Sequence, residues 1–84
     1  MVELKYFAGL REQLGLAHES VELPEHVRDV AALTEWLRSR GGSWREALAA
    51  GKPVKVAVNR DMAQSTTALH DGDEVAYFPP VTGG

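Results

Sequence analysis

The sequence has no cysteine, which excludes disulfide bonds and thiolate metal sites from this chain of 84 residues. It has no apolar run near the roughly 20 residues of a membrane-spanning helix and no signal-peptide pattern, so we expect a cytoplasmic protein without a membrane partner. The formal charge of −3 argues against nucleic acid as the main partner. A glycine-rich phosphate loop and a serine nucleophile motif are also missing. These absences indicate a small domain that does not catalyse a reaction alone.

Metal ligands are sparse and scattered along the chain. His18, His26 and His70 have no partner three or four residues away, so the sequence predicts no metal site. Asp71 and Asp73 resemble a fragment of a calcium loop, but the longer ligand spacing and the distal glutamate are missing. This stretch is more typical of a polar turn that precedes a strand.

Alternation of apolar and polar residues predicts the strands. The pattern is clear at the two ends of the chain, where one face of each segment is apolar. It is weakest between residues 63 and 69, where we expect a short edge strand after a turn at residues 59–61. The four clearer strands are expected at residues 2–8, 19–23, 54–58 and 74–78.

Apolar residues recur every three or four positions, as on one face of a helix, between the second and third of these strands. Asp29 is a good N-cap for a principal helix, which carries an apolar stripe and ends at Gly41. Ser43 is expected to cap a shorter helix over residues 44–48, and residues 10–14 form a helical turn. We expect Trp36 and Trp44 to lie in the core, and expect three arginines near the helix end to form a solvated face: Arg38, Arg40 and Arg45.

This order of elements describes an α+β roll. Two opening strands, a principal helix and then strands to the end suit a mixed sheet of about five strands with the helix packed across one face. By analogy this is the β-grasp arrangement, in which the first and last strands lie side by side and parallel. We expect residues 1–84 to form one such domain.

The last six residues, 79–84, are expected to project from the domain as a tail. Pro79 and Pro80 lack backbone donors and favour an extended path, so they end the sheet pairing. Gly83 and Gly84 have no side chains and would pass through a narrow channel of another protein. Because no other cluster supports chemistry, we interpret the Gly84 carboxylate as the reactive group, once a partner has activated it.

The chain resembles the small, sulfur-carrier subunits of molybdopterin synthase, which are ubiquitin-like β-grasp proteins. The ending from Phe78 to Gly84 is the most specific part of the resemblance, whereas Gly-Gly alone is shared with thiazole-pathway carriers and other ubiquitin-like proteins. The resemblance spans essentially the whole chain. It also rests on Tyr6-Phe7-Ala8, Leu10-Arg11-Glu12, the helix start from Asp29 to Leu37, and Val56-Ala57-Val58-Asn59.

The resemblance implies a mechanism. A ubiquitin-activating-type enzyme uses ATP to adenylate Gly84, and a sulfur donor protein converts the adenylate to a thiocarboxylate. Pro79, Pro80, Val81, Thr82 and Gly83 then enter the active site of a large synthase subunit, where the sulfur is transferred to a cyclic pyranopterin precursor. The implied assembly is a heterotetramer of two small and two large subunits. No cofactor is expected on this chain itself.

Strand alternation adds an expected docking surface. If Tyr6 and Tyr77 point inward, then Phe7 and Phe78 point outward, and parallel neighbouring strands would bring the two phenylalanines together where the tail begins. An exposed aromatic pair there is typical of a partner-binding hot spot. Two alternatives remain open from the sequence: a carrier for thiazole, tRNA-thiolation or amino-acid pathways, and a protein modifier conjugated through Gly84.

Overall fold

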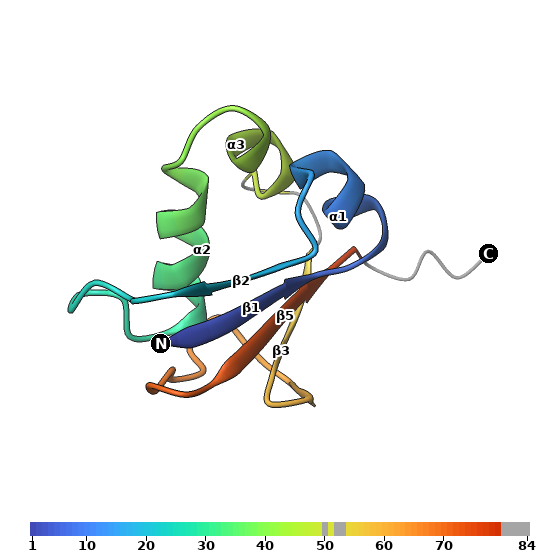
Figure 1. The fold of residues 1–84 in the computed structure, drawn as a ribbon. Helices are drawn as coiled ribbons and strands as arrows, with labels where there is room; N and C mark the ends of the chain where they lie inside the picture. Colours follow the sequence, from blue (N-terminus) through green and yellow to red (C-terminus); the bar gives the residue numbers. More distant parts are fainter. Residues whose placement is uncertain (50, 52–53, 80–84) are drawn as a thin grey trace.

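A five-stranded mixed sheet carries three helices on one of its faces (Figure 1). The structure is a computed structural model that describes residues 1–49, 51 and 54–79. The strands lie in the order β2-β1-β5-β3-β4. In chain order the elements are β1 (Val2–Tyr6), α1 (Ala8–Leu14), β2 (His18–Val21), α2 (Val30–Arg38), α3 (Ser43–Ala47), β3 (Lys55–Val58), β4 (Asp61–Met62) and β5 (Glu74–Phe78).

The first and last strands form the parallel centre of the sheet, as the sequence predicts. Leu4 lies opposite Val75 and Tyr6 opposite Tyr77, while β2 and β3 pair antiparallel on the outer sides of β1 and β5. The side chains of these four residues are at most 1% exposed, because each faces the helices. The alternation of apolar residues therefore sets both the register and the buried face. The α+β, β-grasp prediction is confirmed.

The principal helix α2 covers the middle of the sheet. Its N-cap is Asp29, whose side chain accepts a hydrogen bond from the Ala32 N–H at 2.8 Å, as predicted. Leu33 and Leu37 are fully buried one turn apart and face the strands. No helix in the described part of the chain is long and apolar enough to cross a membrane.

The edge strand does not lie where the sequence analysis placed it. Asn59 and Arg60 both adopt positive φ, at 51° and 72°, and form a two-residue turn directly into β4. The expectations of a turn that includes Asp61 and of a strand within residues 63–69 were therefore wrong. A mirror-image turn matches the twist of the two flanking strands, and Asn59 favours it. Arg60 gives no such signal.

After Ala63, the segment up to residue 69 bonds to the start of α2 and not to the sheet. The carbonyls of Ser65 and Thr67 accept hydrogen bonds from the N–H groups of Ala31 and Val30, at 2.9 and 3.1 Å. These N–H groups belong to the first turn of the helix and have no partner within it. At the start of this segment the Ala63 N–H still donates to the Val56 carbonyl of β3 at 2.9 Å, and farther along a single bridge joins Ala68 to Asp29. Helix capping therefore replaces strand pairing in this segment.

Smaller differences concern element boundaries. The first helix begins at Ala8, two residues before the predicted turn at residues 10–14, and Gly15 ends it with φ of 69° as its C-cap. The N-cap of α3 is Gly42, with no side-chain hydrogen bond, so the capping role predicted for Ser43 was wrong. Trp36 and Trp44 are partly buried and pack against the core, as predicted.

Arg40 lies at the surface, but its guanidinium makes specific contacts. Two nitrogens of its guanidinium lie 2.8 and 3.0 Å from the two carboxylate oxygens of Glu19, on β2. The guanidinium carbon lies 4.4 Å from the ring centroid of Trp44 and 5.3 Å from that of Trp36. The Tyr6 hydroxyl donates to the same carboxylate at 2.9 Å. Arg40 is therefore exposed, as predicted, but cation–π contacts and a bidentate ion pair that the sequence analysis did not predict hold its guanidinium against the fold.

The contact among Tyr6, Glu19 and Arg40 shifts the pKa of each of these three groups. Burial alone would raise the pKa of the Glu19 carboxyl, but hydrogen bonds from Arg40 and Tyr6 outweigh it and hold that pKa below its ordinary value. Burial, together with the hydrogen bond to Glu19, raises the pKa of the Tyr6 hydroxyl. The hydrogen bond with Glu19 also raises the pKa of Arg40. The three groups thus stabilise the fold while Glu19 is ionised.

A Glu19→Gln variant tests this linkage. Because the pKa of Glu19 is lower in the folded state than in the unfolded state, its stabilisation is present above the ordinary pKa of 4.5 and is lost as the pH falls through the folded pKa. We expect the variant to lose about 1–2 kcal/mol of unfolding free energy at neutral pH. Urea unfolding from pH 7 to pH 3 should show this difference shrinking toward zero. A constant difference across the range would contradict the linkage, and the exposed Glu12→Gln on α1 is the matched control.

An Arg60→Gly variant tests the turn. A side chain at positive φ strains the backbone, and Asn-Gly is the preferred sequence for this turn. We expect the variant to gain about 0.5–1 kcal/mol of unfolding free energy, measured by urea denaturation. Arg60→Ala removes the same side chain but keeps the strain, so it should gain nothing. Equal stabilities of the two variants would show that the turn is unstrained.

Candidate functional site

The candidate site lies where β5 ends and the predicted tail begins. Phe78 is the last residue of the strand, and Pro79 follows it outside the sheet. Gly84 and the predicted tail residues Pro80, Val81, Thr82 and Gly83 lie outside the described residues, so their roles stay predictions. The structure does show the surface from which this segment departs.

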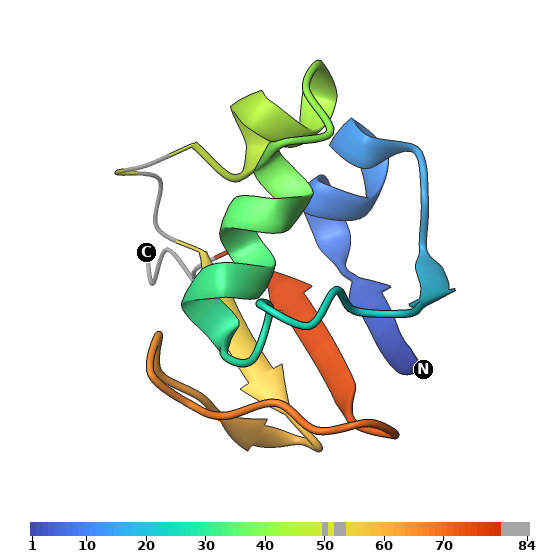
Figure 2. The same ribbon diagram turned by 90° about the vertical axis from the view of Figure 1, so that its left-hand side faces the viewer.

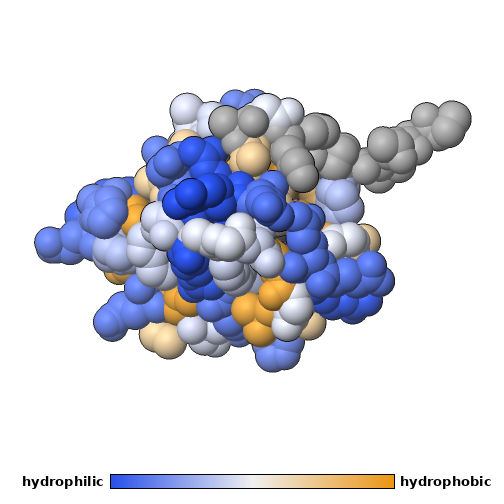
Figure 3. Space-filling view, turned by 90° about the horizontal axis from the view of Figure 1, so that it is seen from above, coloured by the Kyte–Doolittle hydropathy of each residue, from blue (hydrophilic) through white to orange (hydrophobic). Residues whose placement is uncertain are grey.

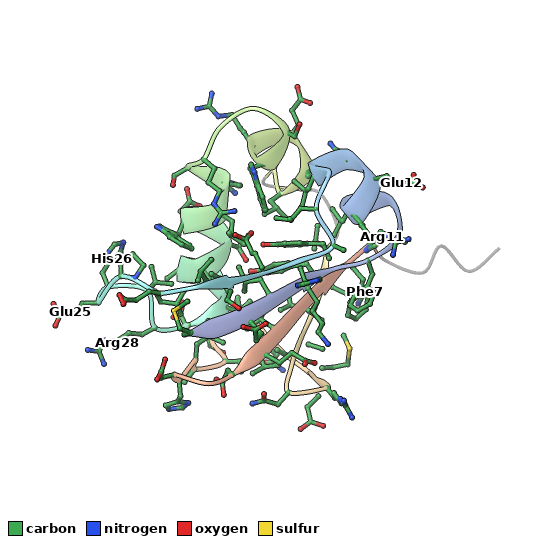
Figure 4. All side chains as sticks on the ribbon, in the orientation of Figure 1. Phe7, Arg11, Glu12, Glu25, His26 and Arg28 are labelled. Carbon is green, nitrogen blue, oxygen red and sulfur yellow. The ribbon has the colours of Figure 1, made fainter. Side chains whose placement is uncertain are left out.

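Phe7 lies beside the end of β5. Its backbone N–H donates to the Tyr77 carbonyl at 3.1 Å, which continues the parallel β1–β5 register by one residue and brings the backbone of Phe7 alongside Phe78. The Phe7 side chain is 45% exposed and Phe78 is half-buried. Figure 4 shows Phe7 at the end of the sheet, on the side away from α2 and α3, with Arg11 of α1 nearby. Their predicted partner-binding role stays a prediction.

A strained residue turns the chain directly after Phe7. Ala8 has φ of 51°, a left-handed conformation that is uncommon for a residue with a side chain. This turn lets the Phe7 carbonyl accept the N–H groups of Leu10 and Arg11 at the start of α1, at 3.1 and 3.4 Å. The chain thus leaves β1 and enters a helix within one residue. Phe7 is left at the surface, and α1 does not cover it.

We call the sheet surface opposite the helices the open face. Because Lys5 pairs with Ala76, Ala76 with Ala57, and Ala57 with Met62, these side chains share that face with Phe7 and Phe78. Met62 is 63% exposed and the alanines are small, so an apolar strip crosses the face from Phe78, at the end of β5, to β4. Lys5 and Glu74 form a 3.2 Å ion pair along its border. An apolar strip with a charged border has the composition of a protein-docking surface.

The helix side has a different surface. Figure 3 views the molecule from that side and shows a largely hydrophilic surface with small, separate hydrophobic areas. Phe7 and Met62, two of the three large hydrophobic side chains exposed in the described part of the chain, belong to the open face. Among the described residues, no three His, Asp or Glu side chains gather to hold a metal ion. The open face is therefore the better candidate for binding a partner.

Two stacked tyrosines lie on the buried side of the sheet, next to the end of β5 from which the predicted tail departs. The rings of Tyr6 and Tyr77 stack with centroids 6.2 Å apart, and the Tyr77 hydroxyl lies 2.8 Å from the Thr34 hydroxyl of α2. Burial raises the pKa of Tyr77, so its hydroxyl stays neutral. These contacts join the C-terminal ends of β1 and β5 to the principal helix. The sequence pattern placed both tyrosines inward, but it gave no signal for the Thr34 contact.

Comparison with known proteins identifies the relatives of this chain. The ThiS family matches residues 4–84. The molybdopterin synthase sulfur carrier subunits of Escherichia coli and Haemophilus influenzae are 38% and 37% identical to it, over 100% of this chain and of each relative.

Solved structures support the same grouping. A putative molybdopterin converting factor subunit 1 from Pyrococcus furiosus superimposes with a TM-score of 0.76 and 32% identity, covering 95% of this chain and 97% of its own. A chain of the complex of subunits 1 and 2 of the Helicobacter pylori molybdopterin-converting factor superimposes with a TM-score of 0.66 and 25% identity, covering 99% of this chain and 97% of its own. SAMP1 from Haloferax volcanii superimposes with a TM-score of 0.74 and 28% identity, covering 99% of this chain and 98% of its own.

Both kinds of match extend over nearly the full length of this chain, and the matched structures share its fold. The chain belongs to the ThiS family of ubiquitin-like sulfur carriers, among relatives named as molybdopterin synthase sulfur carrier subunits.

Proposed function

We propose that this chain is the sulfur carrier subunit of a molybdopterin synthase in molybdenum cofactor biosynthesis. The observation that carries the proposal is the pairing of Phe7 with the end of β5, which places an exposed aromatic side chain at the base of the tail. Full-length similarity to carriers of that name supports it. We place the carrier in the cytoplasm, where ATP is available for its activation.

The proposed chemistry takes place at Gly84. A ubiquitin-activating-type adenylyltransferase joins the Gly84 carboxylate to AMP from ATP and releases pyrophosphate. A sulfur donor protein then delivers sulfur at the oxidation level of sulfide, which attacks the acyl carbon of Gly84, displaces AMP and leaves a thiocarboxylate. In the large subunit this sulfur attacks the cyclic pyranopterin precursor, and water then cleaves the acyl C–S bond, which leaves the sulfur on the precursor and restores the carboxylate at Gly84. The chain itself binds no cofactor in this scheme, since ATP belongs to the activating enzyme.

Docking aims the tail at the large subunit. The H. pylori structure holds subunit 1 together with subunit 2 of its own molybdopterin-converting factor. We propose that this chain binds its large subunit through the open face, with Phe7 and Phe78 nearest the entrance through which the tail passes. Pro79 and Pro80 would hold the first part of the tail extended. Two small and two large subunits would form the complete enzyme.

A second function is favoured by one comparison. SAMP1 of H. volcanii matches 99% of this chain with a TM-score of 0.74, and a structure of H. volcanii small archaeal modifier protein 1 matches 95% of it with a TM-score of 0.73. The same adenylated Gly84 would then acylate a lysine amine of a target protein instead of accepting sulfur. Lysine-linked adducts of this chain in cell extracts would support a modifier. Carriers for thiazole, tRNA-thiolation or amino-acid pathways would instead be recovered with the enzymes of those pathways.

Deletion of Gly84 tests the reactive group. We expect the shortened chain to accept no sulfur, because its activated carboxyl would stop one residue short of the nucleotide. The thermal midpoint should not change, since terminal residues contribute little to a core. Mass spectrometry after incubation with ATP, the activating enzyme and a sulfur donor measures thiocarboxylate formation. Thr82→Ser, which keeps the tail length, is the control, and sulfur on the shortened chain would refute the assignment.

A Phe7→Ser, Phe78→Ser double variant tests the docking surface. Truncation of aromatic hot-spot residues costs about 2 kcal/mol or more of binding free energy, so we expect at least about thirtyfold weaker binding to the large subunit. Isothermal titration calorimetry measures the affinity. Met62→Ser makes a similar change farther from the tail and should cost less. A thermal midpoint that falls steeply would show that the two rings belong to the core, and unchanged affinity would move the docking surface elsewhere.

A further inference from the structure

The strand β2 forms an edge of the sheet that no other described element covers. It pairs only with β1, and Figure 2 shows residues 18–21 at one margin of the molecule. Proteins commonly protect an edge strand by making it very short, or by placing proline, lysine or a bulge in it. The opposite edge, β4, is protected in the first way, since it is two residues long. In contrast, β2 has neither proline nor lysine, and its register with β1 is unbroken.

The backbone groups that point away from β1 belong to His18, Ser20 and Glu22. The Ala17 carbonyl accepts from the Tyr6 N–H at 2.9 Å, so the backbone groups of Ala17 point toward β1. Successive residues of a strand direct these groups to opposite sides, and every second residue from His18 onward therefore points outward. Within the described part of the chain, these outward N–H and carbonyl groups have no hydrogen-bond partner. They form a row of donors and acceptors that another strand can use.

The side chains along this edge are complementary to a second, reversed copy of the same edge. His18 and Ser20 lie on the open face, opposite Lys5 and Glu3 of β1, and Glu22 follows with the same alternation. Two copies of β2 that run antiparallel around Ser20 bring His18 of one copy opposite Glu22 of the other. Two-fold symmetry repeats this pair on the other side of Ser20. The same register aligns the outward backbone groups of both copies.

On the helix side of this edge, the charge of Glu19 is already balanced. Its carboxylate accepts from two guanidinium nitrogens of Arg40, at 2.8 and 3.0 Å. The half-buried Trp36 lies over the same strand, because the guanidinium carbon of Arg40 is 5.3 Å from its ring centroid. In the antiparallel register, Val21 of a second copy would lie opposite Glu19. The added strand would therefore meet an apolar ring and a neutralised carboxylate.

We propose that β2 is a self-association edge, at which two copies of this chain join their sheets through antiparallel pairing centred on Ser20. The occupant is a second copy because His18 and Glu22 complement each other within one edge. The apolar strip from Phe78 to Met62 stays uncovered, since it lies on β5, β3 and β4. The reversed strand direction places the two β5 ends at opposite ends of the joined sheets. The pairing does not depend on whether Gly84 carries sulfur.

The concentration dependence of the full chain tests the proposal. Because the paired edge is short, we expect weak dimers with a Kd on the order of 0.1–1 mM. Sedimentation equilibrium from about 10 µM to 1 mM covers this range. Amide signals of His18, Ser20 and Glu22 in ¹⁵N spectra should shift with concentration, and exchange of the Ser20 amide with solvent should slow. A chain that stays monomeric would leave the edge to a foreign strand and overturn the proposal, as would shifts confined to Phe7 and Met62.

A Ser20→Pro variant removes the central outward N–H. Proline is tolerated in an edge strand where the N–H faces solvent, so the pairing of β2 with β1 should persist. We expect self-association at least about tenfold weaker, because proline has no backbone donor. Ser20→Ala loses the side-chain hydrogen bond to Glu3 but keeps the N–H, and it should associate like the unchanged chain. Equal association of Ser20→Pro and Ser20→Ala would overturn the strand pairing.

Charge exchange tests the register while it keeps every backbone donor. His18→Glu sets two carboxylates opposite each other in both pairs, so self-association should weaken at least about tenfold. Adding Glu22→Lys to this variant should restore the affinity. Gln64→Glu introduces a carboxylate beyond β4, at the other edge of the sheet, and should change nothing. Equal losses in His18→Glu and Gln64→Glu, or no recovery in the double variant, would overturn the proposed pairing.

Discussion

The parallel pairing of β1 with β5 is the constraint on which the rest of the structure depends. It joins residues from the two ends of the chain, Leu4 to Val75 and Tyr6 to Tyr77, and buries all four against the helices. Because side chains alternate along a strand, the same register turns Phe7 and Phe78 to the opposite surface. A slip of one residue would exchange the two faces. The core and the docking surface are therefore two consequences of one register.

The surrounding contacts keep this register fixed at the end where the tail departs. The Tyr77 hydroxyl meets Thr34 of α2, and the stacked Tyr6 donates to Glu19 of β2. Arg40 completes the arrangement by joining Glu19 to the two tryptophan rings. Each of these polar groups is paired, and no buried side-chain polar atom in the described part of the chain lacks a partner. The base of the tail thus rests on a rigid support, which suits a segment that must be aimed at another protein.

The sequence predicted the features that depend on periodicity and missed those that depend on distant contacts. Alternation located β1, β3 and β5, and Asp29 marked the start of α2. The position of β4 was wrong because Arg60 adopts a positive φ that its residue type does not signal. The contact of Arg40 with Glu19 was missed because Glu19 lies 21 positions earlier, and no local pattern connects them. For the candidate site, alternation was sufficient to place Phe7 and Phe78 on one face, whereas the strained turn at Ala8 was not visible.

The central claim is that the carboxyl group of Gly84 carries sulfur between proteins. The most direct measurement is high-resolution mass spectrometry of the C-terminal peptide of this chain, isolated from cells that make molybdenum cofactor. The account predicts a fraction of peptide in which one carboxylate oxygen is replaced by sulfur. It also predicts that this fraction falls when the intact chain is incubated with the large subunit and its precursor before the peptide is prepared. A C-terminal peptide found only as carboxylate or joined to lysine, under conditions in which the cofactor is being made, would contradict it.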